Sequence, residues 1–219
     1  MEIKKEDLRK FVDEFKLLND NFKDLARKIM VDKSINMDEF ALSSINRAIS
    51  IIEGFRTLYL DNNVLAAVHL IRIQIDNLIS YNSVSIAEDK MYLDYVLSGK
   101  PINKFKDLNK QKFSDYYLVS KTSESFPELF NMYNKYCGFI HFGKEHLNYI
   151  KSDPKLEGVK FSVEIGNFNS FNIEELNIFV QDMISVSIIL YNRIFEWSEF
   201  RLKVIEDIKK ISTSTEIEI

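Results

Sequence analysis

The segment LRKFVDEFKLLNDNFKDLARKI, from Leu8 to Ile29, carries the clearest pattern in the sequence. Its apolar residues follow alternating steps of three and four, with Lys, Asp and Glu between them: Leu8, Phe11, Phe15, Leu18, Phe22, Leu25 and Ile29. This spacing places them on one narrow face of an α-helix. Such a face packs along another long helix, which belongs either to the same chain or to a second subunit.

Similar patterns extend through most of the chain. They predict helices at 37–60, 64–81, 86–97, about 125–141, and 173 to about 211. Ser85 with Glu88 and Asn172 with Glu175 have the spacing of a capping box, which marks the start of a helix. Residues that interrupt helices are scarce, with 6 Gly and 3 Pro among 219 residues. We therefore expect a mainly α fold, a single-domain helical bundle of about six helices over residues 1–211. Residues 212–219 are expected to form a frayed tail.

One short segment has the pattern of a strand instead. Val159, Phe161, Val163 and Ile165 alternate with polar or small residues, and Gly166-Asn167 follows as a turn signal. The sequence therefore predicts a short strand or β-hairpin inserted near 159–170.

The composition excludes several classes of protein. Net charge is −4, from 29 basic and 33 acidic residues, which excludes a strongly basic nucleic-acid coat protein. One Cys and three His leave no disulfide framework and no Cys-based zinc module, so we expect no metal and no cofactor. Charges interrupt the apolar stretch at 173–195, and the first ten residues are charged. Both features favour a cytoplasmic protein with no membrane partner.

A basic segment at 99–121 is open to two interpretations. Its lysines Lys104, Lys106, Lys110 and Lys112 alternate with aromatic residues, among them Phe105, Phe113, Tyr116 and Tyr117. In the first interpretation the lysines bind an RNA backbone and the aromatic rings stack on bases. In the second, the segment is a solvated connector with a short helix whose aromatic rings reach the core.

Two groups of residues are candidates for chemistry. Arg72 and Asp76 lie one helical turn apart within an otherwise apolar run, where charges rarely occur unpaired. They form either an internal ion pair or a site in which Arg72 binds phosphate and Asp76 orients a histidine. The second group gathers near the predicted helix end at His141 and includes Tyr133, Asn134, Lys135 and His146. Its alternative is a pair of ordinary surface or capping histidines.

These two groups also carry a family resemblance. LIRIQIDNLISY (Leu70 to Tyr81) followed by YNKYCGFIHFGKEHL (Tyr133 to Leu147) resembles a group of uncharacterised bacterial helical proteins related to the HEPN superfamily. HEPN domains are helical bundles that often form homodimers. Many are metal-independent ribonucleases that serve as toxins, paired with a cognate antitoxin, or act in antiviral defence.

The resemblance implies a specific chemistry and one departure from it. The HEPN hallmark is an Arg, four to six intervening residues, and a His. Counting back from His141, those spacings give Tyr136, Lys135 and Asn134, so no Arg is in register. The resemblance implies that His141 is a general base on a ribose 2′-hydroxyl and that Lys135 or Arg72 stabilises the charged phosphorane. The alternative is a non-catalytic helical interaction or dimerisation module that binds a protein partner, such as an antitoxin or a defence-system protein.

Overall fold

The computed structural model describes residues 5–31, 34–141, 143 and 171–215. These residues form a mainly α-helical bundle, as the sequence predicts. Its long helices are α1 (Lys5–Ile29), α2 (Asn36–Leu60), α3 (Val64–Ala87) and α8 (Ile173–Thr215). Its shorter helices are α4 (Tyr92–Leu97), α5 (Asp115–Ser123) and α6 (Glu128–Ile140), with a single 3-10 turn at Ile102–Lys104.

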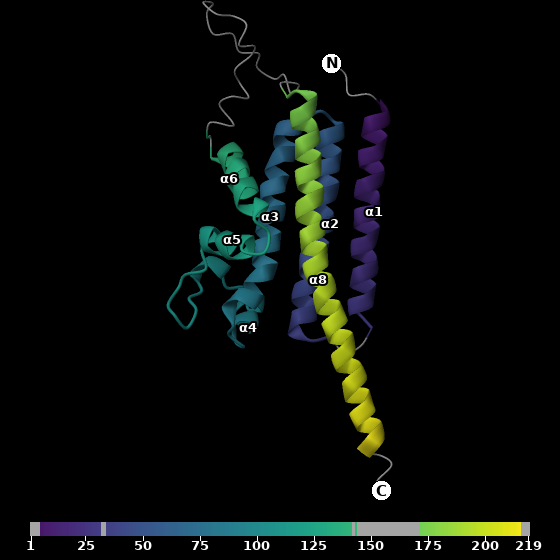
Figure 1. Cartoon of the computed structure of the whole chain (residues 1–219), viewed down its shortest axis with the longest axis vertical. Helices are drawn as coiled ribbons and strands as arrows, with labels where there is room; N and C mark the ends of the chain where they lie inside the picture. The colour runs from purple at the N-terminus through teal and green to yellow at the C-terminus, as the bar shows by residue number, and fades with distance from the viewer. Residues whose placement is uncertain (1–4, 32–33, 142, 144–170, 216–219) are drawn as a thin grey trace, which may run out of the picture.

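Helix α3 is the centre of the molecule. The long helices run side by side, and α4, α5 and α6 lie against one side of α3 (Figure 1). Helix α3 contacts α2 and α8 in the long-helix layer and α5 and α6 on the other side. Because it is covered on several sides, most of its residues are apolar around the whole circumference.

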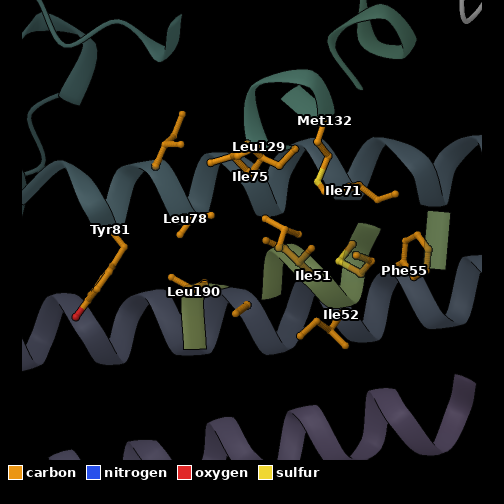
Figure 2. Packing of buried hydrophobic residues seen from close by; sticks show 14 of the residues in the cluster. Ile51, Ile52, Phe55, Ile71, Ile75, Leu78, Tyr81, Leu129, Met132 and Leu190 are labelled. Atoms are coloured by element: carbon orange, nitrogen blue, oxygen red, sulfur yellow. The ribbon is translucent and has the colours of Figure 1, made fainter. Parts of the chain in front are cut away.

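The core follows from this arrangement. Ile71, Ile75 and Leu78 of α3 lie between α2 and α6, near the side chains of Ile51, Phe55, Leu129, Met132 and Leu190, while Ile52 lies on the side of α2 that faces α1 (Figure 2). All of these side chains are buried. Burial of apolar area of this kind is the main stabilising contribution to a helical bundle.

The apolar face of α1 packs inside the same chain. Phe15, Leu18, Phe22, Leu25 and Ile29 are all buried against α2 and α8. The ring of Phe15 lies 5.6 Å from that of Phe55 on α2, and the ring of Phe22 lies 5.5 Å from that of Tyr191 on α8. This face is therefore part of the bundle core. It packs on helices of the same chain, which is the first of the two alternatives that its pattern left open.

The predicted helix boundaries are wrong at two places. Helix α3 continues six residues past the predicted end at 81, to Ala87, and α4 begins only at Tyr92. The hydroxyl of Ser85 donates to the carbonyl of Asn82 inside α3 instead of capping a new helix. Helix α8 also continues to Thr215, so part of the predicted tail at 212–219 is helical.

The start of α8 agrees with its sequence signal. The backbone N–H of Asn172 donates to Glu175 Oε2 at 2.9 Å, and that of Glu175 donates to Asn172 Oδ1 at 3.0 Å. This reciprocal pair is a capping box, which satisfies two N–H groups that the helix start leaves free. The predicted strand or hairpin near 159–170 lies outside the described residues. Within the described part of the chain, the β-type pairing is a single bridge between Lys106 and Lys112.

Helix α8 is the most apolar long element of the fold. Its stretch Ile173–Asp207 is long and apolar enough to cross a membrane, which by itself is weak evidence for a spanning helix. The buried residues of this stretch pack into the bundle core, among them Phe179, Met183, Val186 and Leu190. Packing in the bundle therefore accounts for the buried side of this helix, which is 39% of its most apolar window.

Candidate functional site on helices α3 and α6

Arg72 is the best-connected residue between α3 and α6. It is only 5% exposed. Its Nε lies 3.2 Å from the sulfur of Cys137 on α6, and its Nη1 donates to the carboxylate of Asp76 one turn along α3. Its Nη2 lies 3.6 Å from Oδ2 of Asp115, the first residue of α5. The guanidinium thus joins three helices.

An aromatic ring covers the same guanidinium. The Cζ atom of Arg72 lies 4.1 Å from the ring centroid of Tyr133, which is within the range of a cation–π contact. Burial raises the pKa of Tyr133, and the positive charge of Arg72 opposes that shift. With its ring face covered and each of its three nitrogens in contact with Cys137 or a carboxylate, Arg72 fits an internal ion pair.

Lys135 is engaged on another side of α6. Its Nζ lies 3.0 Å from Oδ2 of Asp182 on α8, and the hydroxyl of Tyr136 donates to the same oxygen at 2.5 Å. The ammonium also lies over the rings of Tyr136 and Phe179. Burial, followed by the charge of Asp182, raises the pKa of the Tyr136 hydroxyl far above its ordinary value. Lys135 therefore fastens α6 to α8.

His141 lies apart from both cations. It follows the last residue of α6, and its backbone N–H donates to the carbonyl of Cys137 at 2.9 Å. Its side chain is exposed. Among the described residues, no hydrogen bond or ion pair joins this imidazole to Arg72, Lys135 or Asp76. The structure thus brings Arg72, Asp76 and Tyr133 together, while Lys135 and His141 lie elsewhere on α6.

The remaining candidates are dispersed. Asn134 is exposed on α6, and His146 lies outside the described residues. Lys104, Lys106, Lys110 and Lys112 are all exposed. Phe105 and Phe113 turn inward, since their rings lie 4.6 and 5.3 Å from that of Tyr92, whereas Tyr116 is exposed. For these two rings the packing fits the second interpretation of the segment, in which its aromatic rings reach the core.

Sequence reasoning missed a buried polar cluster at the other end of the bundle. Asp38, near the start of α2, accepts hydrogen bonds from Arg201 Nε at 2.7 Å and Trp197 Nε1 at 3.1 Å, both on α8. The exposed fractions of Asp38 and Arg201 are only 1% and 4%. The one available signal was an Arg at a position in register with the buried residues of α8.

A cavity lies beside this cluster. It has a volume of about 500 Å³ between α2, α3, α4 and α8, and its walls include Met37, Tyr81, Leu93, Arg193, Trp197 and Phe200. Most of its lining is apolar. The hydroxyl of Tyr81 is buried and has no hydrogen-bond partner among the described residues.

Comparison with known proteins identifies no relative of the chain. No family model, no curated protein and no solved structure matches the chain. In the described residues there is also no group of three or more His, Cys, Asp or Glu placed to hold a metal ion.

Proposed function

We propose that the chain is a non-catalytic helical interaction module that binds a protein partner. The observation that carries this proposal is the second half of α8. Helix α8 runs on past the ends of α1 and α2 (Figure 1), and Phe200 and Val204 are exposed close to the point where it leaves the bundle, while the cations on α3 and α6 are held in internal contacts.

The internal contacts weigh against a phosphate site on α3 and α6. A guanidinium binds phosphate best through two parallel N–H donors. Arg72 directs its donors to Asp76, Cys137 and Asp115. Binding of a phosphate would place it beside two carboxylates and would separate the buried Arg72 guanidinium from its partially exposed partner Asp76, and both steps are costly.

The projecting half of α8 favours binding. Close to the point where α8 leaves the bundle, Phe200 is 59% exposed, and Val204, one turn further on, is 40% exposed. Exposed apolar residues gathered in one place mark interaction surfaces in soluble proteins. We also propose that the module works in the cytoplasm, since its most apolar helix is accommodated by the bundle.

Site-specific photo-crosslinking in cells that express the full chain tests this proposal. A photoreactive residue at position 204 should give one discrete cross-linked protein, identified by mass spectrometry. The matched control is position 188 on the same helix, because Ile188 is similarly exposed, at 44%, but points to the opposite side of α8. The interaction proposal is rejected if position 204 gives no product, or the same products as position 188.

A metal-independent ribonuclease is the second candidate, and one observation favours it. His141 is exposed at the end of the same helix that carries Tyr133 and Lys135. An imidazole there would take the proton of a ribose 2′-hydroxyl. The 2′-oxygen would then attack the adjacent phosphate, break its bond to the 5′-oxygen of the next nucleotide, and leave a 2′,3′-cyclic phosphate. Lys104, Lys106, Lys110 and Lys112 would add backbone contacts to the RNA.

An RNA cleavage assay in EDTA separates the two candidates. The interaction proposal expects wild type and His141→Ala to be equally inert on several RNAs. Cleavage by the wild type that leaves cyclic phosphate ends, and that His141→Ala abolishes, would establish the ribonuclease instead. Arg72→Lys and Lys135→Met would then identify the cation.

A further inference from the structure

We infer that the protein partner of α8 is a second copy of this chain, bound antiparallel along the projecting end of the helix, residues 202–215. This inference rests on the proposed interaction function and gives it a specific occupant. It starts from the face of α8 that the bundle leaves uncovered.

One stripe of residues on α8 runs from the cavity to the projecting end of the helix. Arg193, Trp197, Phe200 and Val204 follow steps of four, three and four, so they lie on one side of the helix. The first three line the cavity, and Val204 is one turn beyond it. A partner helix that lies along Val204 therefore meets the cavity without changing direction.

The bundle stops supporting α8 close to Arg201. Arg201 is the last buried residue of the helix among those described, and its bond to Asp38 marks the end of α2 in this direction. Residues 202–215 then extend for roughly 21 Å, which is about four helical turns. A helix of this length is only marginally stable in water without packing against another element. A partner helix packed along residues 202–215 would supply the stability that this segment lacks.

The charges beside the stripe favour a copy of the same helix. Lys203 and Asp207 lie four residues apart on one flank of the stripe. In an antiparallel pair centred at position 205, Lys203 of each copy lies opposite Asp207 of the other. Two-fold symmetry forms this pair twice, whereas parallel pairing in register sets Lys203 against Lys203.

The cavity supplies the contact area that the projection lacks. Two helices that touch over roughly 21 Å form a small interface, and a stable dimer buries at least about 1,000 Å². In the antiparallel arrangement, the end of each α8 runs beside positions 195–208 of the other copy. It thus covers the mouth of the cavity at Trp197 and Phe200, twice per dimer.

Sedimentation equilibrium of the purified full chain tests the inference. The wild type should have twice the chain mass of 25.8 kDa at micromolar concentrations. Val204→Glu should sediment as a single chain, because the buried carboxylate has no partner in the pair. Ile188→Glu, on the opposite side of α8, should remain dimeric. Circular dichroism would show that both variants are folded if Ile188→Glu keeps the wild-type helical signal and Val204→Glu loses no more of it than residues 202–215 contribute.

A charge exchange tests the antiparallel geometry separately. Lys203→Glu should weaken the dimer about tenfold at low salt, because it sets two acidic pairs against each other. The double variant Lys203→Glu/Asp207→Lys should restore the wild-type dissociation constant. Failure of the double variant to restore association would overturn the antiparallel register.

Other outcomes overturn the dimer. A wild type that stays at 25.8 kDa at every concentration excludes the second copy as the occupant. If position 204 then cross-links a different protein in cells, the interaction function stands and only this inference fails. If instead the single chain floats with anionic phospholipid vesicles, the stripe binds a membrane and both proposals fail.

Discussion

The guanidinium Nε of Arg201 donates to Oδ2 of Asp38 at 2.7 Å, across 163 residues of sequence. The same carboxylate accepts from the indole of Trp197 and from the backbone N–H of Ile35. One side chain therefore caps the start of α2 and holds α8 at the place where α8 leaves the bundle. The contact of Asp38 with Arg201 therefore fixes the direction in which residues 202–215 leave the bundle.

Removal of this carboxylate should destabilise the fold strongly. Asp38→Ala leaves the Arg201 guanidinium buried without its carboxylate, and such a loss costs about 3 to 5 kcal/mol. Urea denaturation measures the change in the free energy of unfolding. Asp24→Ala is the control, since Asp24 pairs with Arg27 at the surface and its loss should cost less than about 1 kcal/mol. Equal effects of the two substitutions would contradict the role of Asp38.

The Arg72 contacts should depend on the shape of the guanidinium as well as on its charge. Arg72→Lys keeps the charge but loses the planar fork and the stacking on Tyr133, so it should cost about 1 to 3 kcal/mol. Thermal or urea unfolding measures the loss. Arg56→Lys is the control, because Arg56 pairs with Glu53 on a more exposed part of α2. A neutral Arg72→Lys would show that Arg72 does not fasten α3 to α6.

Asp182 should couple Lys135 and Tyr136 energetically. Tyr136→Phe removes a hydrogen bond to a carboxylate and should cost about 1.5 to 3 kcal/mol. In a double-mutant cycle, Lys135→Met should cost more in the Tyr136→Phe background, since Asp182 then keeps neither partner. Strict additivity of the two substitutions would show that they do not share Asp182.

Alkaline pH should destabilise the protein through its buried tyrosines. Burial raises the pKa of Tyr59 and Tyr92 from 10.0 to about 12, and raises that of Tyr81 and Tyr136 further. Above pH 10 the unfolded chain therefore loses protons that the folded chain keeps. Each such tyrosine then lowers the free energy of unfolding by up to about 1.4 kcal/mol per pH unit.

Urea midpoints between pH 8 and pH 11 measure this effect. They should be level below pH 9 and fall steeply above pH 10. Tyr59→Phe should make the fall shallower, while Tyr116→Phe, at an exposed position, is the control. A midpoint that is constant or rising up to pH 11 would contradict the burial of these hydroxyls.

The sequence predicted the elements whose causes are local. The apolar face at Leu8 to Ile29 predicted α1 because helical periodicity is visible within a few turns. The Asn172 and Glu175 pair predicted the start of α8 because both partners of a capping box lie within one turn. The end of α3 was misplaced because Tyr92, the partner of the Ser83 hydroxyl, belongs to the next helix.

The candidate site was predictable only in part, because only some of its contacts join residues that are close in the sequence. The pair formed by Arg72 and Asp76 was visible as one turn of a helix. The contacts of Arg72 with Cys137 and of Lys135 with Asp182 join residues 65 and 47 positions apart, and no local pattern encodes them. The cluster of Asp38, Trp197 and Arg201 was missed because its partners lie on opposite ends of the sequence.

Hydrogen exchange along α8 tests the central claim most directly, because amides exchange slowly only where a helix is held by packing. In the wild type, the amides of residues 203–215 should be protected. In Val204→Glu they should exchange at nearly the rate of an unfolded chain, while those of residues 176–198 remain protected in both proteins. Rapid exchange over 203–215 in the wild type, or equal exchange in the two proteins, would contradict the claim that this end of α8 pairs with a second copy of the chain.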